Sequence, residues 1–208
     1  AFSLHNSESW EDYYGSWSMK SSGFREWYLD PEEVFDALEK NVATFHKKEY
    51  KHRILHSGTG TSQLPFRLKK EGYKSQTGID FSDKCIDSLN KFISERKIAG
   101  LEFRKMDVLN LDFKEKTYNV IVDKGTLDCV MLANNPIETV SKYLKECARV
   151  LKPGGQLAIF SLFPPKKRTI CIDCKKYGID LDCISLEMPE AFETPNQGAS
   201  FLYIFTKS

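Results

Sequence analysis

The sequence has no long apolar run and no excess of charge of one sign. None of its stretches approaches the roughly 20 consecutive apolar residues that a membrane-spanning helix needs, so no membrane segment is expected. Thirty Lys and Arg residues against 29 Asp and Glu residues give a net charge of +1, which argues against a nucleic-acid partner, because phosphate binding needs a basic excess. The first residues also lack a basic stretch followed by an apolar one, so no secretory leader is predicted.

A repeated pair of cysteines at metal-binding spacing is also absent. Of the six cysteines, only Cys171 and Cys174 have the C-x-x-C spacing, and only Cys183 is near them in the sequence. A structural zinc would need a second ligand pair at matching spacing, so no metal site is predicted. Cysteines in a chain without an export signal are expected to be reduced, which favours a cytosolic or nuclear protein, with the cytoplasm as the predicted location.

The 208 residues contain enough apolar side chains for one core. Hydrophobic residues make up 41% of the chain and aromatic residues 12%, so we predict a single domain over residues 1–208. Residues 1–30 stand apart from the rest because aromatic side chains follow one another closely in them. These are Trp10, Tyr13, Tyr14, Trp17, Phe24, Trp27 and Tyr28.

Strand and helix patterns alternate from residue 53 onwards. Strands are expected over 53–56, 73–80, 101–106, 118–123, 156–161, 182–188 and 200–206. Helices are expected from Asp30, over 63–70, from Ser82, over 137–151, and near 169–177. This alternation predicts an α/β protein, a three-layer sandwich over a mostly parallel seven-stranded sheet. The last two strands have no helix pattern between them, which predicts a C-terminal antiparallel hairpin at the end of that sheet.

A glycine loop follows the first strand, and an acid ends the second. Gly58-Thr59-Gly60 joins the strand over 53–56 to a helix, and Asp80 stands twenty positions after Gly60. The carboxyl ends of parallel strands meet at one edge, where glycines allow close approach of a ligand and a carboxylate accepts ribose hydroxyls. The pair therefore indicates a nucleoside ligand. The alternative is a simple glycine turn followed by an aspartate that caps a helix.

The loop also shows which nucleoside ligands fit poorly. A dinucleotide site has a third glycine three positions after the second, where this chain has Gln63, and no lysine stands in P-loop register. A cofactor without phosphate therefore fits better. Asp107 and Val108 follow the third strand, where they could meet an adenine edge, and Asp123 ends the fourth strand.

Taken together, these motifs resemble class I, seven-β-strand methyltransferases that use S-adenosylmethionine. The run Asp123-Lys124-Gly125-Thr126-Leu127-Asp128 is the most specific of them, and Arg149–Gly155 adds to it. The chain is similar to the branch that includes lysine methyltransferases of elongation factor 1-alpha and of citrate synthase. The resemblance extends to Trp10–Tyr14, Glu26–Tyr28 and Phe201–Lys207, and it implies a Rossmann-like form of the predicted sandwich.

The resemblance implies S-adenosylmethionine as cofactor and S-adenosylhomocysteine as product. Residues 1–30 would cover the cofactor site, and aromatic faces would attract the cationic sulfonium. The implied cofactor-binding residues are Trp10, Tyr14, Trp27, Gly58, Gly60, Asp80, Phe81, Asp107, Val108 and Lys124. Two departures are Thr59, where the family usually has Cys, and His56-Ser57, where many relatives have an acid. We interpret His56 as a packing residue.

We predict an N-methyltransferase that acts on a lysine of a protein, with an elongation-factor-like partner implied by the resemblance. A lysine acceptor must lose its proton before transfer, and Asp123 and Asp128 are our candidates for orienting the amine. Asp128 could equally cap a turn. The alternatives are a small-molecule methyltransferase, a non-catalytic binding protein of the same fold and a nicotinamide dehydrogenase. The oligomeric state is not predicted.

Overall fold

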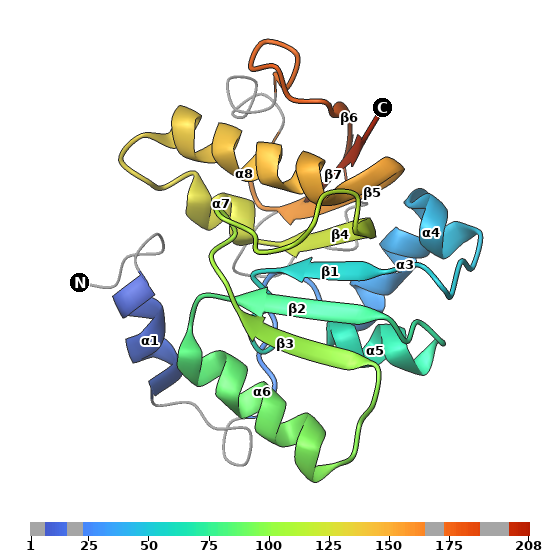
Figure 1. Cartoon of the computed structure of the whole chain (residues 1–208), viewed down its shortest axis with the longest axis vertical. Coiled ribbons are helices and arrows are strands. Elements are labelled where there is room, and N and C mark those ends of the chain that lie inside the picture. Colours follow the sequence, from blue (N-terminus) through green and yellow to red (C-terminus); the bar gives the residue numbers. More distant parts are fainter. Residues whose placement is uncertain (1–6, 16–22, 165–172, 188–199) are drawn as a thin grey trace.

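The computed structural model describes residues 7–15, 23–164, 173–187 and 200–208. Its strands are β1 (Ile54–Ser57), β2 (Gln76–Asp80), β3 (Leu101–Lys105), β4 (Tyr118–Lys124), β5 (Leu151–Ser161), β6 (Asp182–Glu187) and β7 (Phe201–Thr206). Its helices are α1 (Ser7–Gly15), α3 (Pro31–Asn41), α4 (Ala43–His46), α5 (Leu64–Lys70), α6 (Asp83–Glu95), α7 (Thr126–Val130) and α8 (Pro136–Val150). All seven predicted strands are present (Figure 1).

The strands form one sheet in the order β3-β2-β1-β4-β5-β7-β6. The first five strands in this order are parallel to one another, and β7 runs antiparallel to both β5 and β6. This confirms the mostly parallel sheet and the C-terminal hairpin. The hairpin is inserted so that its second strand lies inside the sheet and its first strand forms the edge.

Two apolar layers cover the two faces of this sheet. Ile121 of β4 packs with α8 in one cluster, whereas its neighbours Val120 and Val122 pack with α3 and α5 in the other. Leu157 and Ala158 of β5 divide in the same way. Because successive side chains of a strand point to opposite faces, near-continuous apolar strands require helices on both sides. The predicted three-layer sandwich is therefore confirmed.

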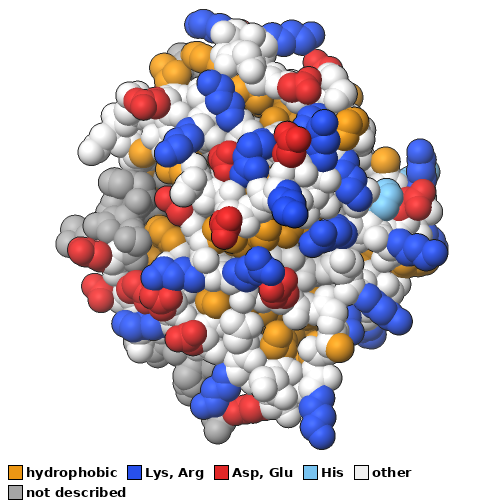
Figure 2. Space-filling view, in the orientation of Figure 1, with side chains coloured by type: hydrophobic (Ala, Val, Ile, Leu, Met, Phe, Trp, Pro, Cys, Tyr) orange, Lys and Arg blue, Asp and Glu red, His pale blue; other side chains and the backbone are white. Residues whose placement is uncertain are grey.

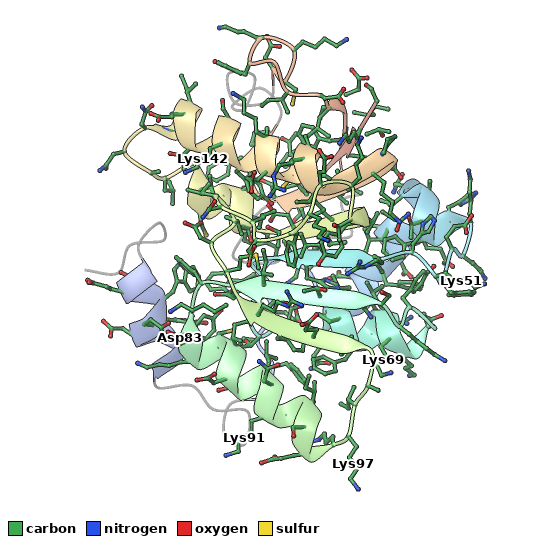
Figure 3. The ribbon with its side chains drawn as sticks, in the orientation of Figure 1. Lys51, Lys69, Asp83, Lys91, Lys97 and Lys142 are labelled. Carbon is green, nitrogen blue, oxygen red and sulfur yellow. The ribbon has the colours of Figure 1, made fainter. Side chains whose placement is uncertain are left out.

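A third apolar cluster lies at the β3 end of the sheet. It joins Trp10 and Tyr14 of α1 to Cys85 and Leu89 of α6 and to Phe103 of β3. Figure 1 shows α1 beside α6 at this end, and Figure 3 shows Asp83, the first residue of α6, next to α1. Trp10 and Tyr14 of the N-terminal segment thus pack on the same domain as the glycine loop.

Several local expectations differ from the structure. The helix from Asp30 ends at Asn41, because Val42 is extended (φ −112°, ψ 122°), and α4 starts after it. Helices α1 and α7 were not expected from the sequence pattern. The predicted helix near 169–177 lies partly outside the described residues, and Cys174–Gly178 form turns. Trp17 and Cys171 also lie outside the described residues.

The described residues also bear on the sequence predictions about a charged surface patch, a membrane span and a metal site. On the face drawn in Figure 2, acidic and basic side chains are interspersed among the residues that are coloured by type. None of the helices in the described parts of the chain combines the length and the apolar composition that crossing a membrane requires. Within the same residues, no group of three or more Cys, His, Asp or Glu side chains could hold a metal ion.

Candidate active site

A cavity of about 380 Å³ lies at the carboxyl edge of the parallel strands. It is formed where β1 and β4 lie side by side and the chain leaves them toward opposite ends of the sheet, the point at which such sheets bind ligands. Its size falls within the ~300–1,000 Å³ of small-molecule sites. The ten predicted cofactor residues all line it: Trp10, Tyr14, Trp27, Gly58, Gly60, Asp80, Phe81, Asp107, Val108 and Lys124.

The glycine loop after β1 has no room for side chains at its two glycines. Gly58 and Gly60 have φ values of +58° and +50°, in the left-handed region that favours glycine. A Cβ at Gly58 would lie 2.0 Å from Oγ1 of Thr126, and one at Gly60 would lie 3.0 Å from the Tyr14 hydroxyl. The loop therefore presents bare backbone to the cavity.

Asp80 lies at the end of β2 with its carboxylate against this loop. Its Oδ2 accepts a hydrogen bond from the Gly60 amide at 3.0 Å, and its Oδ1 accepts one from the Ser82 amide at 3.1 Å. Burial raises the pKa of Asp80 to about 6, although both amide bonds act in the opposite direction. A ligand that donates hydrogen bonds to this carboxylate would favour its ionised form.

Asp107 and Val108 form another part of the cavity wall, just after β3. The Asp107 carboxylate is exposed and accepts a hydrogen bond from the Leu109 amide at 2.8 Å, and Val108 is half-buried beside it. A short polar and apolar pair of this kind can contact the edge of a flat heterocycle.

The aromatic residues of the N-terminal segment close one side of the cavity. Trp10 and Tyr14, one turn apart on α1, are stacked with ring centroids 5.9 Å apart, and Trp27 meets Trp10 edge-on at 5.8 Å. Burial, followed by the charge of Asp80, raises the pKa of Tyr14 above its usual range, so its phenol stays neutral. Neutral aromatic faces next to carboxylates form a suitable environment for a cation.

Lys124 and Glu26 connect the N-terminal segment to the end of β4. The Lys124 ammonium donates to Oε2 of Glu26 and to the Trp27 carbonyl oxygen, both at 2.7 Å. Glu26 also accepts hydrogen bonds from the Ser62 hydroxyl and the Gln63 amide, beyond the glycine loop. Burial lowers the pKa of Lys124, and the charge of Glu26 acts against that shift. The ion pair thus holds residues 26 and 27 over the cavity.

The two carboxylates predicted to orient an amine are buried, and neither is among the residues that line the cavity. Asp123 accepts hydrogen bonds from the amides of Thr126 and Leu127 at the start of α7, and from the Tyr143 hydroxyl at 2.8 Å. Burial raises its pKa to about 7. Asp123 therefore orders the turn that leads from β4 into α7.

Asp128 has a different set of donors. It accepts hydrogen bonds from the hydroxyls of Tyr28 and Ser161 at 2.9 Å and 2.6 Å, and from the Leu162 amide at 3.1 Å. Tyr28 lines the cavity, so Asp128 reaches the cavity wall through this phenol.

His56 lies in β1, is buried, and forms part of the cavity wall. Its Nε2 is 2.7 Å from Oε1 of Gln76, whose amide nitrogen donates to the carbonyls of Pro65 and Tyr73. Since the Gln76 oxygen can only accept, the histidine donates from Nε2. Burial lowers the pKa of His56 to about 4, so it is neutral, in line with its interpretation as a packing residue.

These features fit an adenosyl cofactor with a sulfonium centre. The bare Gly58 and Gly60 backbone leaves room for a ligand, Asp80 and Asp107 supply acceptors, and aromatic faces lie on one side. The buried Oγ1 of Thr59, another residue of the cavity wall, has no hydrogen-bond partner among the described residues. A polar ligand would satisfy such an atom.

Three further residues of this region, Glu26, Tyr28 and Thr126, have contacts that the sequence does not indicate. All three belong to motifs of the resemblance, but the motifs imply no role for them. The Thr126 hydroxyl donates to the Ser57 carbonyl at 2.8 Å. The Tyr28–Asp128, Glu26–Lys124 and Thr126–Ser57 hydrogen bonds join residues 69 to 100 positions apart in the sequence. No local pattern reports pairs that are so distant.

Comparisons with known proteins agree with this geometry. A family model described as a methyltransferase domain matches residues 48–207. The chain is 30% identical over 159 residues to the eEF1A lysine and N-terminal methyltransferase of Mus musculus, and the match covers 76% of this chain and 21% of that protein. It is also 30% identical over 165 residues to EEF1A lysine methyltransferase 2 of Homo sapiens, with 76% of this chain and 68% of that protein covered. The chain thus spans about a fifth of the length of the mouse relative.

Solved structures support the fold. A magnesium protoporphyrin IX methyltransferase from Synechocystis with bound SAM has a TM-score of 0.61 at 16% identity, covering 85% of this chain and 81% of that one. A SAM-dependent methyltransferase from Methanosarcina mazei has a TM-score of 0.56 at 18% identity, with coverages of 78% and 96%. At these identities the likeness concerns the arrangement of the backbone.

Proposed function

The chain belongs to the methyltransferase domain family and carries an S-adenosylmethionine-dependent methyltransferase domain, and from this premise we propose that it methylates a lysine side chain of a protein. Two relatives at 30% identity are named as lysine methyltransferases of eEF1A, which supports a protein acceptor of the elongation-factor kind. With such a partner, we also propose that the protein acts in the cytoplasm.

S-adenosylmethionine, when bound, supplies an electrophilic methyl group on a positively charged sulfur. We propose that Asp80 would hold its ribose and that Asp107, Val108 and Phe81 would contact its adenine. Trp10, Tyr14 and Trp27 would lie beside the sulfonium, because aromatic faces attract a cation. Gly58, Gly60 and Lys124 would contact other parts of the cofactor. These ten residues line one cavity, which supports their assignment to one cofactor.

The observation that carries the proposed acceptor is that Trp27 and Tyr28 line the same cavity as the residues assigned to the cofactor. An amine must be neutral to act as a nucleophile, and apolar walls lower the pKa of a lysine. Trp27 and Tyr28 supply aromatic walls of this kind, and the Tyr28 hydroxyl is hydrogen-bonded to Asp128. A lysine side chain that enters the cavity beside these two residues would be desolvated by their rings. Its amine would then lie close to the Tyr28 hydroxyl oxygen.

The N-terminal segment contributes by excluding water. The contacts of its described residues with the rest of the domain include the Glu26–Lys124 ion pair and Glu11 on α1, whose carboxylate accepts the Asp83 amide at the start of α6. With water excluded by this segment, the sulfonium of a bound cofactor would be surrounded by fixed dipoles and aromatic rings. Positioning the acceptor is then the main task, since methyl transfer is an in-line displacement.

Transfer of labelled methyl groups tests this proposal. The chain is incubated with S-adenosylmethionine carrying a labelled methyl group and a soluble extract, and separately with purified elongation factor 1-alpha. We expect label in protein, recovered as methyl-lysine after hydrolysis, and little label with the Asp80→Asn variant.

Two other outcomes would each contradict the proposal. Label found only in small molecules would indicate a small-molecule methyltransferase of the same fold. No label at all, together with normal binding of S-adenosylhomocysteine, would indicate a non-catalytic binding protein.

A further inference from the structure

We propose that the phenolic oxygen of Tyr28 contacts and orients the acceptor amine, and that Asp128 acts on the reaction only through Tyr28. This inference rests on the proposed lysine acceptor and assigns its contact within the same site. It makes Tyr28 a catalytic residue and Asp128 a positioning residue.

Of Tyr28 and Asp128, only Tyr28 lies at the surface of the cavity. The Tyr28 hydroxyl donates to Oδ2 of Asp128 at 2.9 Å. The carboxylate is buried, with 4% of its residue exposed, and therefore cannot accept a hydrogen bond from a ligand in the cavity without moving. The phenol is the part of this pair that faces a ligand.

The ring of Tyr28 is held in one place. Its backbone has a φ of +68°, a conformation that bulky residues rarely adopt, and the flanking Leu29 amide donates to the Trp27 carbonyl at 2.8 Å. Gly125 lies under the ring, and a Cβ there would approach Cε2 at 3.0 Å and the hydroxyl at 3.1 Å. Strained backbone of this kind persists where the surroundings hold it, which is common at functional sites.

Asp128 is held just as firmly from the other side. Its Oδ1 accepts the Ser161 hydroxyl at 2.6 Å, and its Oδ2 accepts the Leu162 amide at 3.1 Å in addition to the phenol. Burial and the charge of Asp128 raise the pKa of Tyr28 above its usual range, so the phenol keeps its proton. The phenolic proton is donated to Asp128, so the lone pairs of the phenolic oxygen can accept a hydrogen bond from an N–H group.

A neutral lysine amine matches this arrangement. It has two N–H groups and one lone pair, so an N–H donated to Tyr28 leaves the nitrogen lone pair to be directed at the methyl carbon. Donation to Asp128 strengthens the phenol as an acceptor, because hydrogen bonds in a chain polarise one another. No proton passes through Tyr28 in this role.

Three other groups of the cavity wall, Lys124, Thr126 and Cys129, suit this contact less well. Lys124 donates to Glu26 and to the Trp27 carbonyl, and the Thr126 hydroxyl donates to the Ser57 carbonyl. Burial raises the pKa of Cys129 to about 12, so it remains a thiol, a weak hydrogen-bonding group. Tyr28 is therefore the group we assign to the amine.

Removing the single hydroxyl tests the assignment. In Tyr28→Phe the ring remains over Gly125, and we expect the maximal rate of methyl-lysine formation in a soluble extract to fall about 10- to 100-fold, because a misoriented acceptor reacts slowly. The KM for S-adenosylmethionine, the affinity for S-adenosylhomocysteine and the melting temperature should stay near their wild-type values. Tyr73→Phe is the matched control, because the Tyr73 hydroxyl bonds the Phe45 carbonyl and its residue does not line the cavity.

A double-variant cycle separates the two roles. Asp128→Asn should lower the same rate, and Tyr28→Phe with Asp128→Asn should be no slower than Tyr28→Phe alone. An unchanged rate in Tyr28→Phe, or losses that multiply in the double variant, would overturn the inference while leaving lysine methylation by the wild type intact. If the wild type forms no methyl-lysine, the proposed function fails first and the inference with it.

Discussion

At the scale of single residues, the three buried carboxylates Asp80, Asp123 and Asp128 differ in their hydrogen-bond donors and in whether they face the cavity. Asp80 accepts two backbone amides and still lines the cavity. Asp123 accepts two amides and a phenol at the start of α7, and Asp128 accepts two hydroxyls and an amide. Only the first of the three carboxylates faces the cavity, so their chemical roles follow from their partners.

Gly58 provides a test of the bare loop. Gly58→Ala and Gly154→Ala both place a side chain at positive φ, which costs about 1–2 kcal/mol, but a Cβ at Gly154 has nothing within 4 Å. We expect both variants to melt lower and Gly58→Ala to melt lowest, because its Cβ meets Thr126. Its affinity for S-adenosylhomocysteine should fall at least about tenfold, or about 1.4 kcal/mol, measured by calorimetry. If the two variants bound S-adenosylhomocysteine equally well, the glycine loop would not be part of the cofactor site.

The raised pKa of Asp80 predicts a pH dependence of cofactor binding. Because its pKa in the folded protein is about 6, the carboxyl is protonated below that pH, and ribose hydroxyls bind the ionised form better. Affinity for S-adenosylhomocysteine should therefore be constant above pH 7 and fall about tenfold per unit below pH 6. The charge of Glu11 contributes to the raised pKa. Titration calorimetry on Asp80→Asn should show weaker binding without this slope, whereas a flat wild-type profile from pH 5 to 7 would exclude the role.

At the scale of elements, the N-terminal segment is joined to the domain by a few polar contacts. The Glu26–Lys124 pair is largely buried, with side-chain exposures of 21% and 8%, whereas Glu32, paired with Arg67, is 65% exposed. Breaking a buried pair leaves an uncompensated charge, but exposed pairs contribute little. We therefore expect the Glu26–Lys124 pair to contribute more to the stability of the fold than the Glu32–Arg67 pair.

Glu26→Gln should destabilise the fold by about 3–5 kcal/mol, because it leaves the Lys124 ammonium buried without its counter-charge. Glu32→Gln, the matched control, should cost at most ~1 kcal/mol. Adding Lys124→Met to Glu26→Gln should recover part of the loss, since no charge then remains. Urea unfolding measures the free energy of unfolding of the wild type and of these three variants. Equal effects of the two single substitutions would mean that the segment is held by other contacts.

At the scale of the whole molecule, the sheet order brings the site together. The order β3-β2-β1-β4-β5 places the carboxyl ends of β1, β2 and β4 at one edge, although their last residues are Ser57, Asp80 and Lys124. Helices on both faces bury the sheet and leave this edge as the cavity wall. A ligand bound there contacts segments from residue 10 to residue 139, so binding should stabilise the whole fold.

Thermal shift measures that coupling and discriminates between cofactors. S-adenosylhomocysteine at a hundredfold excess over its dissociation constant should add ~2.7 kcal/mol, which raises the melting temperature by roughly 5–11 °C for a domain of this size. NAD should give no shift, because Gln63 stands where a dinucleotide site has its third glycine. A shift with NAD and none with S-adenosylhomocysteine would instead favour a dehydrogenase.

The sequence by itself determined the layers of the fold and the place of the site. Apolar strands alternating with amphipathic helices allow few arrangements, and a parallel sheet gathers strand ends at one edge. The glycines of the loop, Asp80 and Asp107 could therefore be assigned to one crevice before their contacts were known. These signals are local: each lies within a few residues of a strand end.

Tertiary structure alone decided which side chains face the cavity and which lie behind it. Tyr28 bonds Asp128 across 100 positions and Lys124 bonds Glu26 across 98, and no pattern along the chain indicates such pairs. The burial of Asp123 and Asp128 likewise depends on α7, α8 and β5 packing around them. A side chain's partners and exposure are properties of the packed molecule, because the free energy of burying a charge depends on every element that surrounds it.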